Sequence, residues 1–212
     1  MASRLALAAA ACMVAMTVSC SSTVNKPAAP EPSEPPQKPE LTQVTTSMFV
    51  DRSAVPNNSG MTFSAPDISS DWEGPADPVD PPECGPLFWG PQPTQAGSVS
   101  WTPPIPAGTS TNNKGKFFNL FLIVPAERPD LRSLLGKCGT IEIQGIATKV
   151  SPLPMPGVPS WALPTRVAAH GANGAGIIGL YRGLYVSVSF TQNPAADLSP
   201  NDTDALVKLF ND

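Results

Sequence analysis

The sequence predicts an α+β domain with a mainly antiparallel, twisted sheet, two or more flanking helices and one disulfide. Three observations support this fold class. The 212 residues include 27 Pro and 16 Gly, which interrupt helices too often for a helix bundle or a coiled coil. Hydrophobic residues make up 41% of the chain, enough to bury a core, and several apolar runs have the length and alternation of strands. With 14% charged residues and a formal net charge of −4, the chain is not expected to bind nucleic acid.

The first 19 residues are expected to be an export signal. Arg4 precedes an apolar run from Leu5 to Val18, whose 14 residues are fewer than the roughly 20 that span a bilayer. The small residues before Cys20 fit a bacterial lipobox, in which diacylglycerol alkylates the thiol of that cysteine. An ordinary secretory signal followed by an unmodified Cys20 is the alternative. The lipobox predicts an anchor that holds the protein at the extracytoplasmic face of the cell membrane.

Residues 20–43 are expected to form a Pro-rich tether, and residues 44–212 a single domain. Six prolines lie between Pro27 and Pro39, and large apolar side chains are almost absent there. As a polyproline II helix, the tether would hold the domain up to roughly 70 Å from the bilayer. An unstructured leader with no spacing role is the alternative.

The first part of the domain is predicted to contain short strands at 45–55 and 61–65, followed by a long loop from Asp67 to Glu83. This loop has six acidic residues, four prolines and no Lys or Arg. A calcium-binding loop would need the spacing Asp-x-Asp/Asn-x-Asp/Asn-Gly, which is absent. We therefore expect a solvated loop.

The middle of the domain is predicted to contain a central strand, a short helix and a bulged strand. Residues 117–124 are apolar on both faces, which is typical of a strand inside a sheet. Leucines at i, i+3 and i+4 within residues 131–135 indicate a helix between Pro129 and Gly136. In the following strand the apolar residues change face after Gly145, which indicates a β-bulge.

Three further strands are predicted, over residues 161–169, 177–181 and 184–190. A Gly-rich turn separates the first two, and Arg182–Gly183 is the expected turn of a hairpin between the last two. In the last strand the alternate apolar residues share one face: Leu184, Val186, Val188 and Phe190.

A closing helix is predicted from Ser199 onward. Ser199 is a typical N-cap, Pro200 suits the first helical position, and Asp202 interacts favourably with the helix dipole. The apolar face expected to pack on the sheet consists of Leu206, Leu209 and Phe210.

Two cysteines, Cys84 and Cys138, remain after the signal and the lipidated residue are set aside. In an exported protein two such cysteines predict one disulfide. Half of a metal site is the alternative, but the only histidine, His170, has no Cys-x-x-Cys pair near it, so no metal is expected.

The order of these features resembles a group of actinobacterial, largely mycobacterial, lipoproteins. The residues that carry the resemblance are Pro82-Glu83-Cys84-Gly85, Cys138 and Tyr181-Arg182-Gly183-Leu184. The single domain of these lipoproteins is similar to the extracellular sensor domain of the PknH-type receptor kinase, in which four cysteines form two disulfides around a cleft. Only Cys84 and Cys138 are available here. Because most of these lipoproteins have no assigned molecular function, the resemblance implies a fold and a location more than an activity.

No motif indicates catalysis or a cofactor. Residues 174–179 match G-x-G-x-x-G, but the match leads into strand-like sequence instead of opening a helix, so we expect a flexible turn and no cofactor. His170 lies beside glycines, as a turn residue does, and no G-x-S-x-G elbow is present. Glu142 has no second carboxylate to act with and is expected to face outward. The protein is therefore not expected to be an enzyme.

The charge distribution offers two interpretations. Residues 114–182 contain eight basic and three acidic residues. They could form a surface for anionic lipid headgroups or phosphorylated glycans, or they could be neutralised by the acidic loop. We expect a non-catalytic ligand- or partner-binding domain, and the candidate binding residues are Trp89, Trp101, Arg166 and Arg182. A structural envelope lipoprotein without a small ligand and an unrecognised hydrolase are the alternatives.

Overall fold

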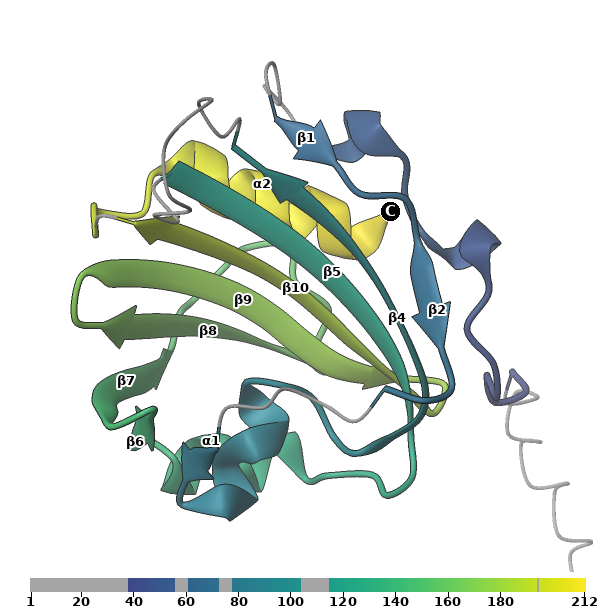
Figure 1. Ribbon diagram of the computed structural model, residues 1–212, viewed down its shortest axis with the longest axis horizontal. Helices are drawn as coiled ribbons and strands as arrows, with labels where there is room; N and C mark the ends of the chain where they lie inside the picture. The colour runs from purple at the N-terminus through teal and green to yellow at the C-terminus, as the bar shows by residue number, and fades with distance from the viewer. Residues whose placement is uncertain (1–37, 56–60, 73–77, 104–114, 194) are drawn as a thin grey trace, which may run out of the picture. The chain divides into compact units, whose positions relative to one another are not determined.

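The structure is a computed structural model that describes residues 38–55, 61–72, 78–103, 115–193 and 195–212. Within these residues ten strands form one antiparallel sheet, with the order β1-β4-β5-β10-β9-β8-β7-β6-β3 and β2 paired to β4 (Figure 1). The strands are β1 (Thr62–Phe63), β2 (Asp67–Ser69), β3 (Val79–Asp80), β4 (Pro93–Thr102), β5 (Gly115–Pro125), β6 (Thr140–Ile143), β7 (Ile146–Pro152), β8 (Ala162–Ala169), β9 (Ala172–Tyr181) and β10 (Leu184–Asn193). The helices are α1 (Leu131–Lys137) and α2 (Pro200–Asn211), with the 3-10 helices η1 (Thr46–Met48), η2 (Arg52–Ala54) and η3 (Pro82–Leu87). The predicted α+β fold class is confirmed.

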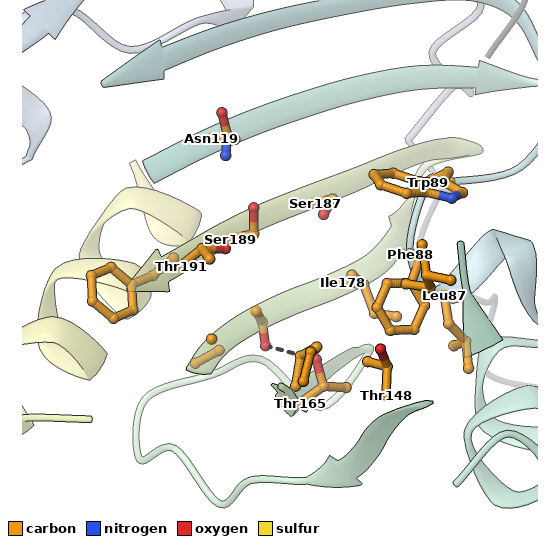
Figure 2. Close-up of a pocket in the computed structure, with 18 of the residues that line it drawn as sticks. Leu87, Phe88, Trp89, Asn119, Thr148, Thr165, Ile178, Ser187, Ser189 and Thr191 are labelled. Atoms are coloured by element: carbon orange, nitrogen blue, oxygen red, sulfur yellow. Dashed lines mark hydrogen bonds between the residues drawn. The ribbon is translucent and has the colours of Figure 1, made fainter. Parts of the chain in front are cut away.

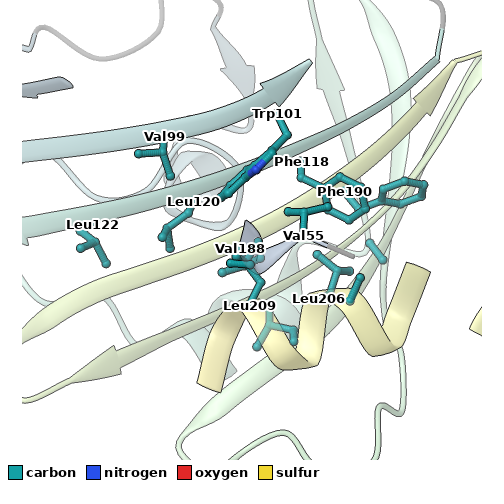
Figure 3. Packing of buried hydrophobic residues seen from close by; sticks show 14 of the residues in the cluster. Val55, Val99, Trp101, Phe118, Leu120, Leu122, Val188, Phe190, Leu206 and Leu209 are labelled. Atoms are coloured by element: carbon teal, nitrogen blue, oxygen red, sulfur yellow. The ribbon is translucent and has the colours of Figure 1, made fainter. Parts of the chain in front are cut away.

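Helix α2 covers one face of the central strands, and the larger hydrophobic cluster lies between them (Figure 3). Its members alternate along each strand, as Val99 and Trp101 do on β4 and Val188 and Phe190 on β10. Leu206 and Leu209 reach this cluster from α2, as predicted. The helix begins with a capping box in which Ser199 accepts from the Asp202 amide and Asp202 accepts from that of Ser199. We call this side of the sheet the helix face.

A smaller cluster occupies part of the opposite face, beside the disulfide. Cys84 in η3 and Cys138 at the end of α1 are joined with a Cα–Cα distance of 5.8 Å, so the predicted disulfide is confirmed. Leu87, Leu131 and Tyr185 are buried around it. The bond thus attaches η3 and α1 to one end of this face of the sheet, which we call the open face (Figure 1).

The residues that precede the domain core run along the edge of the β9–β10 turn. The Leu41 amide donates to the Arg182 carbonyl at 2.8 Å, and Arg182 Nε donates to the Pro39 carbonyl at 2.7 Å. Glu40 and Arg128 form an exposed ion pair at 2.6 Å. Residues 39–41, which belong to the predicted tether, therefore contact the turn that Arg182 and Gly183 form.

Four expectations about local structure are wrong. Residues 45–55 form η1 and η2 instead of a strand, because the Asp51 carboxylate accepts a hydrogen bond from the Ser53 amide at 2.7 Å and caps η2. The loop expected from Asp67 to Glu83 contains β2 and β3, which pair with β4 and β6. Gly145 belongs to a hairpin, not a bulge: Gln144 and Gly145 both have positive φ, which a two-residue β6–β7 turn requires.

The fourth correction concerns the Gly-rich segment after His170. It is not a turn, because β9 already starts at Ala172 and pairs with both β8 and β10. The turn is limited to His170 and Gly171, and His170 is exposed there. Gly174 and Gly176 are therefore residues of a central strand, where they leave space that other residues would fill.

Candidate functional site: a pocket on the open face of the sheet

A pocket of about 440 Å³ lies on the open face of the sheet. Five neighbouring strands, β5, β10, β9, β8 and β7, form its floor. Small-molecule sites usually have volumes of roughly 300–1,000 Å³. The pocket is thus large enough for a small ligand, and it is formed with a single disulfide beside it.

The polar side chains on the floor of the pocket come from β10, along which hydroxyl-bearing and apolar residues alternate. Ser187, Ser189 and Thr191 line the pocket from this strand. Val188 and Phe190, which lie between them in the sequence, belong to the cluster under α2. Successive side chains of a strand point to opposite faces, so one strand gives an apolar helix face and a hydroxyl-bearing open face.

Small residues on β9 and β8, glycine and threonine, leave room for the pocket above the sheet. Gly174 and Gly176 on β9 lie beside β10, and a Cβ at Gly176 would meet the Val188 carbonyl at 3.3 Å and Thr165 Oγ1 at 3.6 Å. Thr165 itself donates to the Gly176 carbonyl at 3.3 Å, as the dashed line in Figure 2 shows. Larger side chains at these positions would occupy the pocket.

An aromatic wall closes one end. Leu87, Phe88 and Trp89 lie at this end, and Ser189 and Thr191 at the other (Figure 2). The wall follows η3 directly: the amides of Phe88 and Trp89 both donate to the Gly85 carbonyl at 2.9 Å, which fixes the turn after the helix. Trp72 and Phe121 extend the wall, with ring centroids 6.4 Å apart and nearly parallel planes.

Gly90 follows the wall residues Leu87–Trp89 and has a positive φ of 81°. Its Cα lies so close to the Ile123 and Tyr185 side chains that a Cβ would clash with Ile123. Glycine is therefore required here both for the backbone conformation and for the close approach to the sheet.

Several polar groups of the pocket have no partner within the described part of the chain. Thr148 Oγ1 donates to the Ile146 carbonyl at 3.2 Å and Asn173 Nδ2 to the Ala196 carbonyl at 3.0 Å. The side chains of Asn119, Ser189 and Thr191, in contrast, make no hydrogen bond to another described residue. Trp89 Nε1 is shielded from solvent and has no acceptor among the described residues. Buried polar groups are usually satisfied, so Trp89 Nε1 is a candidate for a ligand contact. Asn119 and Ser189 are half-buried and Thr191 is exposed at the rim, so their polar groups can bind water or a ligand.

The described lining contains no Asp, Glu, Lys, Arg or His. Its one titratable side chain is Tyr185, whose hydroxyl donates to the Pro86 carbonyl at 3.3 Å. Burial raises the pKa of Tyr185, and a hydrogen bond with Ser187 lowers it by less, so the phenol is neutral at physiological pH. No group of three or more His, Cys, Asp or Glu side chains that could hold a metal occurs in the described ranges. The arrangement offers apolar contacts and neutral hydrogen bonds.

The structure places one of the four predicted binding residues in the pocket. Trp89 is part of the aromatic wall. Trp101 is fully buried on the helix face, where its Nε1 donates to the Arg52 carbonyl at 3.1 Å. Arg166 lies between the lining residues Thr165 and Val167 on β8, which puts it on the opposite face. Arg182 is held at the β9–β10 turn by the Pro39 carbonyl.

Sequence reasoning missed the other wall residues and the hydroxyl-bearing face of β10. The signal for the latter is present in the sequence, since Ser187, Ser189 and Thr191 alternate with the apolar residues that predicted the strand. Trp72 and Phe121 carry no such signal, because only the sheet order brings them together. Cys20 lies outside the described residues. None of the described helices is both long and apolar enough to cross a membrane.

Comparisons with known proteins concern the fold. No protein-family model and no curated protein matches the sequence. Among solved structures, the extracellular domain of PknH from Mycobacterium tuberculosis matches with a TM-score of 0.53 and 12% identity, covering 82% of this chain and 96% of that one. The chain shares its fold with the PknH extracellular domain. The predicted resemblance is confirmed at this level.

A second solved structure is less similar. An uncharacterized protein from Mycobacterium smegmatis, an Rv0999 ortholog, matches with a TM-score of 0.38 and 13% identity, covering 72% of this chain and 86% of that one. At such identities the PknH similarity describes an architecture, and the chemistry of the pocket has to be argued from the residues of this chain.

Proposed function

We propose that this protein is a lipid-anchored, extracytoplasmic domain that binds a ligand in its pocket without catalysing a reaction. The observation that carries the proposal is a 440 Å³ pocket whose described lining combines an aromatic wall with unpaired neutral polar groups. A hydrolase would need a general base beside one of the hydroxyls, and the described lining has no His, Asp or Glu to supply it. Binding without catalysis is what these residues support.

The predicted location is supported by two further features. The Cys84–Cys138 disulfide is typical of proteins that fold in an oxidising compartment. The fold is shared with a domain that is extracellular in PknH. The lipid anchor at Cys20 is supported by the lipobox alone.

The ligand site is tested by isolating the full-length protein from membranes and identifying bound small molecules by mass spectrometry. The blocking variant is Ser189→Leu, because a leucine at the centre of β10 fills the floor. Ser151→Leu is the matched control, since Ser151 is a half-buried serine on β7 that pairs with Arg166, on the face away from the pocket. We expect one compound class to accompany the wild type and Ser151→Leu, and to fall at least tenfold in Ser189→Leu. Equal recovery from all three, or none, would favour a structural envelope lipoprotein without a small ligand.

The anchor is tested separately with Cys20→Ala. We expect this variant to leave the membrane fraction, whereas Cys12→Ala, which changes a cysteine inside the signal, stays in it. If Cys20→Ala remains in the membrane fraction as the wild type does, the lipid anchor is refuted and the ligand site is unaffected.

Anionic lipids or glycans would have to bind away from the pocket. Of the eight basic residues between 114 and 182, four contact other parts of the described chain: Lys116, Arg128, Arg132 and Arg182. Lys116 and Arg128 are paired with Asp202 and Glu40, which reduces the charge that the surface offers to a partner, whereas Arg132 and Arg182 donate to backbone carbonyls and keep their charge. If anionic vesicles bind the protein and added salt does not weaken the binding, a basic surface is not responsible.

A further inference from the structure

We infer that the ligand of the pocket is an uncharged amphiphile, with an apolar chain along the aromatic wall and a hydroxyl-, ester- or amide-bearing head at the hydroxyl-lined end. The inference rests on the proposed ligand binding and adds the ligand's chemical class and orientation. It follows from the charge, the hydrogen-bonding capacity and the shape of the described lining.

The described lining of the pocket is uncharged. A charged group that leaves water needs a counter-charge or several hydrogen bonds, otherwise burial is strongly unfavourable. The described lining has no charged side chain, and Tyr185 stays neutral. The nearby basic residues lie elsewhere: Arg166 on the helix face, and Lys116 paired with Asp202 at 2.8 Å beside α2. A phosphate or carboxylate would therefore find no counter-charge among the described lining residues.

The hydroxyl-lined end of the pocket is polar and neutral. The unpaired side chains of Ser189, Thr191 and Asn119 each combine a donor with acceptor lone pairs. Such groups match hydroxyl, ester and amide groups, which also donate, accept or do both. An anion accepts only, so it would use the donors of these side chains and leave their acceptor lone pairs to water, whereas a neutral head can use both. The end is suited to a neutral head.

The aromatic wall offers apolar contacts. Phe88 and Trp89 present rings at one end, and Ile178 adds an aliphatic surface on the floor beside them. Trp72 packs on the same cluster and its ring contacts that of Phe121, which also lines the pocket. Ring faces and aliphatic groups gain free energy by covering apolar surface. Figure 2 shows Leu87, Phe88 and Trp89 at one end and Ser189 and Thr191 at the other, with Ser187 between them along β10. One elongated molecule would therefore place its two ends on chemically different surfaces.

The test compares three probes that differ in one feature each. Monolauroylglycerol is the neutral amphiphile, its 3-phosphate adds a charge, and glycerol monobutyrate shortens the chain. The full-length protein is held in a nonionic amphipathic polymer so that no detergent competes, and dissociation constants are measured by calorimetry and tryptophan fluorescence below micelle-forming concentrations. We expect monolauroylglycerol to bind at least tenfold more tightly than either of the other two.

Two variants localise the binding. Ser189→Leu is expected to weaken the binding of monolauroylglycerol at least tenfold, and Ser151→Leu, on the other face of the sheet, to leave it unchanged. Should Ser189→Leu fail to fold, Thr191→Val removes one lining hydroxyl at nearly constant volume and is expected to weaken binding severalfold.

The outcomes separate the inference from the proposed function. If the 3-phosphate binds as tightly as monolauroylglycerol and a lining variant weakens both, the pocket is a ligand site but the uncharged class is wrong. If glycerol monobutyrate binds equally well, the assignment of a chain to the aromatic wall is wrong. If no probe binds but a compound that depends on Ser189 accompanies the purified protein, the uncharged amphiphile is wrong and the proposed function stands. If no probe binds and no such compound is recovered, the proposed function fails as well.

Discussion

The helix face and the open face of the sheet come from the same strands and have opposite uses. Along β10, Val188 and Phe190 pack under α2, while Ser187, Ser189 and Thr191 line the pocket. Along β9, Ile177 faces the helix and Gly174 and Gly176 face the pocket. One face is filled by large side chains, and the other is kept hollow by small ones.

This difference shows how a sheet can be both a core and a binding surface. The helix face provides stability, since each buried aliphatic or aromatic side chain contributes roughly 1.5–3 kcal/mol. The hollow on the open face gives up such contacts, and a disulfide at its end compensates. Stability and binding should therefore respond to different substitutions, and the following predictions test that separation from the largest effect to the smallest.

The disulfide should be the largest single contribution on the open face. Replacing both Cys84 and Cys138 by serine is expected to lower the free energy of unfolding by about 4 kcal/mol, because the bond closes a loop with a sequence separation of 54. Urea denaturation measures the change. The wild type under reducing conditions should lose the same amount, and a loss below about 1 kcal/mol would contradict a stabilising role.

On the helix face, Leu206→Ala should lower the free energy of unfolding by about 3 kcal/mol, since Leu206 is fully buried between α2 and the sheet. Lys208→Ala, at an exposed position of the same helix, should change it by less than about 0.5 kcal/mol. Ligand affinity should be the same in both variants. A loss of affinity in Leu206→Ala under conditions where it is fully folded would show that the two faces are coupled.

The N-terminus of α2 should make the helix face sensitive to acid. Burial raises the pKa of Asp202, but hydrogen bonds and charge from Lys116 and hydrogen bonds from Ser199 outweigh it, so the net pKa is lowered. A lowered carboxyl pKa contributes stability above the ordinary value near 3.8, and this contribution is lost as the pH falls through the folded-state pKa. The free energy of unfolding should therefore fall below about pH 4, and less steeply in Asp202→Asn.

Two variants accompany this measurement. Ser199→Ala should cost about 1 kcal/mol at neutral pH, because the N-cap hydrogen bond to the Asp202 amide is lost. Asp204→Asn, at an exposed position two residues further along, should keep the acid dependence of the wild type. An unchanged acid dependence in Asp202→Asn would assign the effect to other carboxylates.

The smallest effect on stability is expected for Ser189→Ala, at less than about 0.5 kcal/mol, because its hydroxyl has no partner among the described residues. Its neighbour in the sequence, Val188→Ala, should cost about 2 kcal/mol. Affinity for monolauroylglycerol should show the reverse order, with a severalfold loss in Ser189→Ala only. Equal losses of affinity in both variants would remove the distinction between the faces.

Much of the fold could be predicted because its signals are local. The doubly apolar run of β5, the apolar alternation of β10 and the Ser199 capping box each lie within about ten residues of sequence. Pairing was harder. Gly174 and Gly176 have low strand propensity, so they indicated a turn, yet two flanking strands supply their hydrogen bonds. The hydrogen bonds of the two flanking strands therefore outweigh the low strand propensity of these glycines.

The site could be predicted only in part, for a related reason. Trp89 and Trp101 are equally plausible in the sequence, and only the register of β4 decides that Trp101 enters the core. Arg166 is adjacent in the sequence to the lining residue Thr165, but it faces away from the pocket because neighbouring residues of a strand point to opposite sides of the sheet. The residues that line the pocket come from several segments between Trp72 and Thr191, so no single sequence motif predicts the pocket.

The contact between residues 39–41 and the β9–β10 turn would transmit force from the preceding chain to the sheet. The Leu41 amide and the Pro39 carbonyl both bind Arg182, at the tip of the hairpin whose two strands form the middle of the pocket floor. With an anchor at Cys20, a pull on the chain before Lys38 would be transmitted to this tip first, and from there along β9 and β10. Such tension would reach the binding surface through this hairpin and the loop that carries Arg128, which is paired with Glu40, before it reached the rest of the fold.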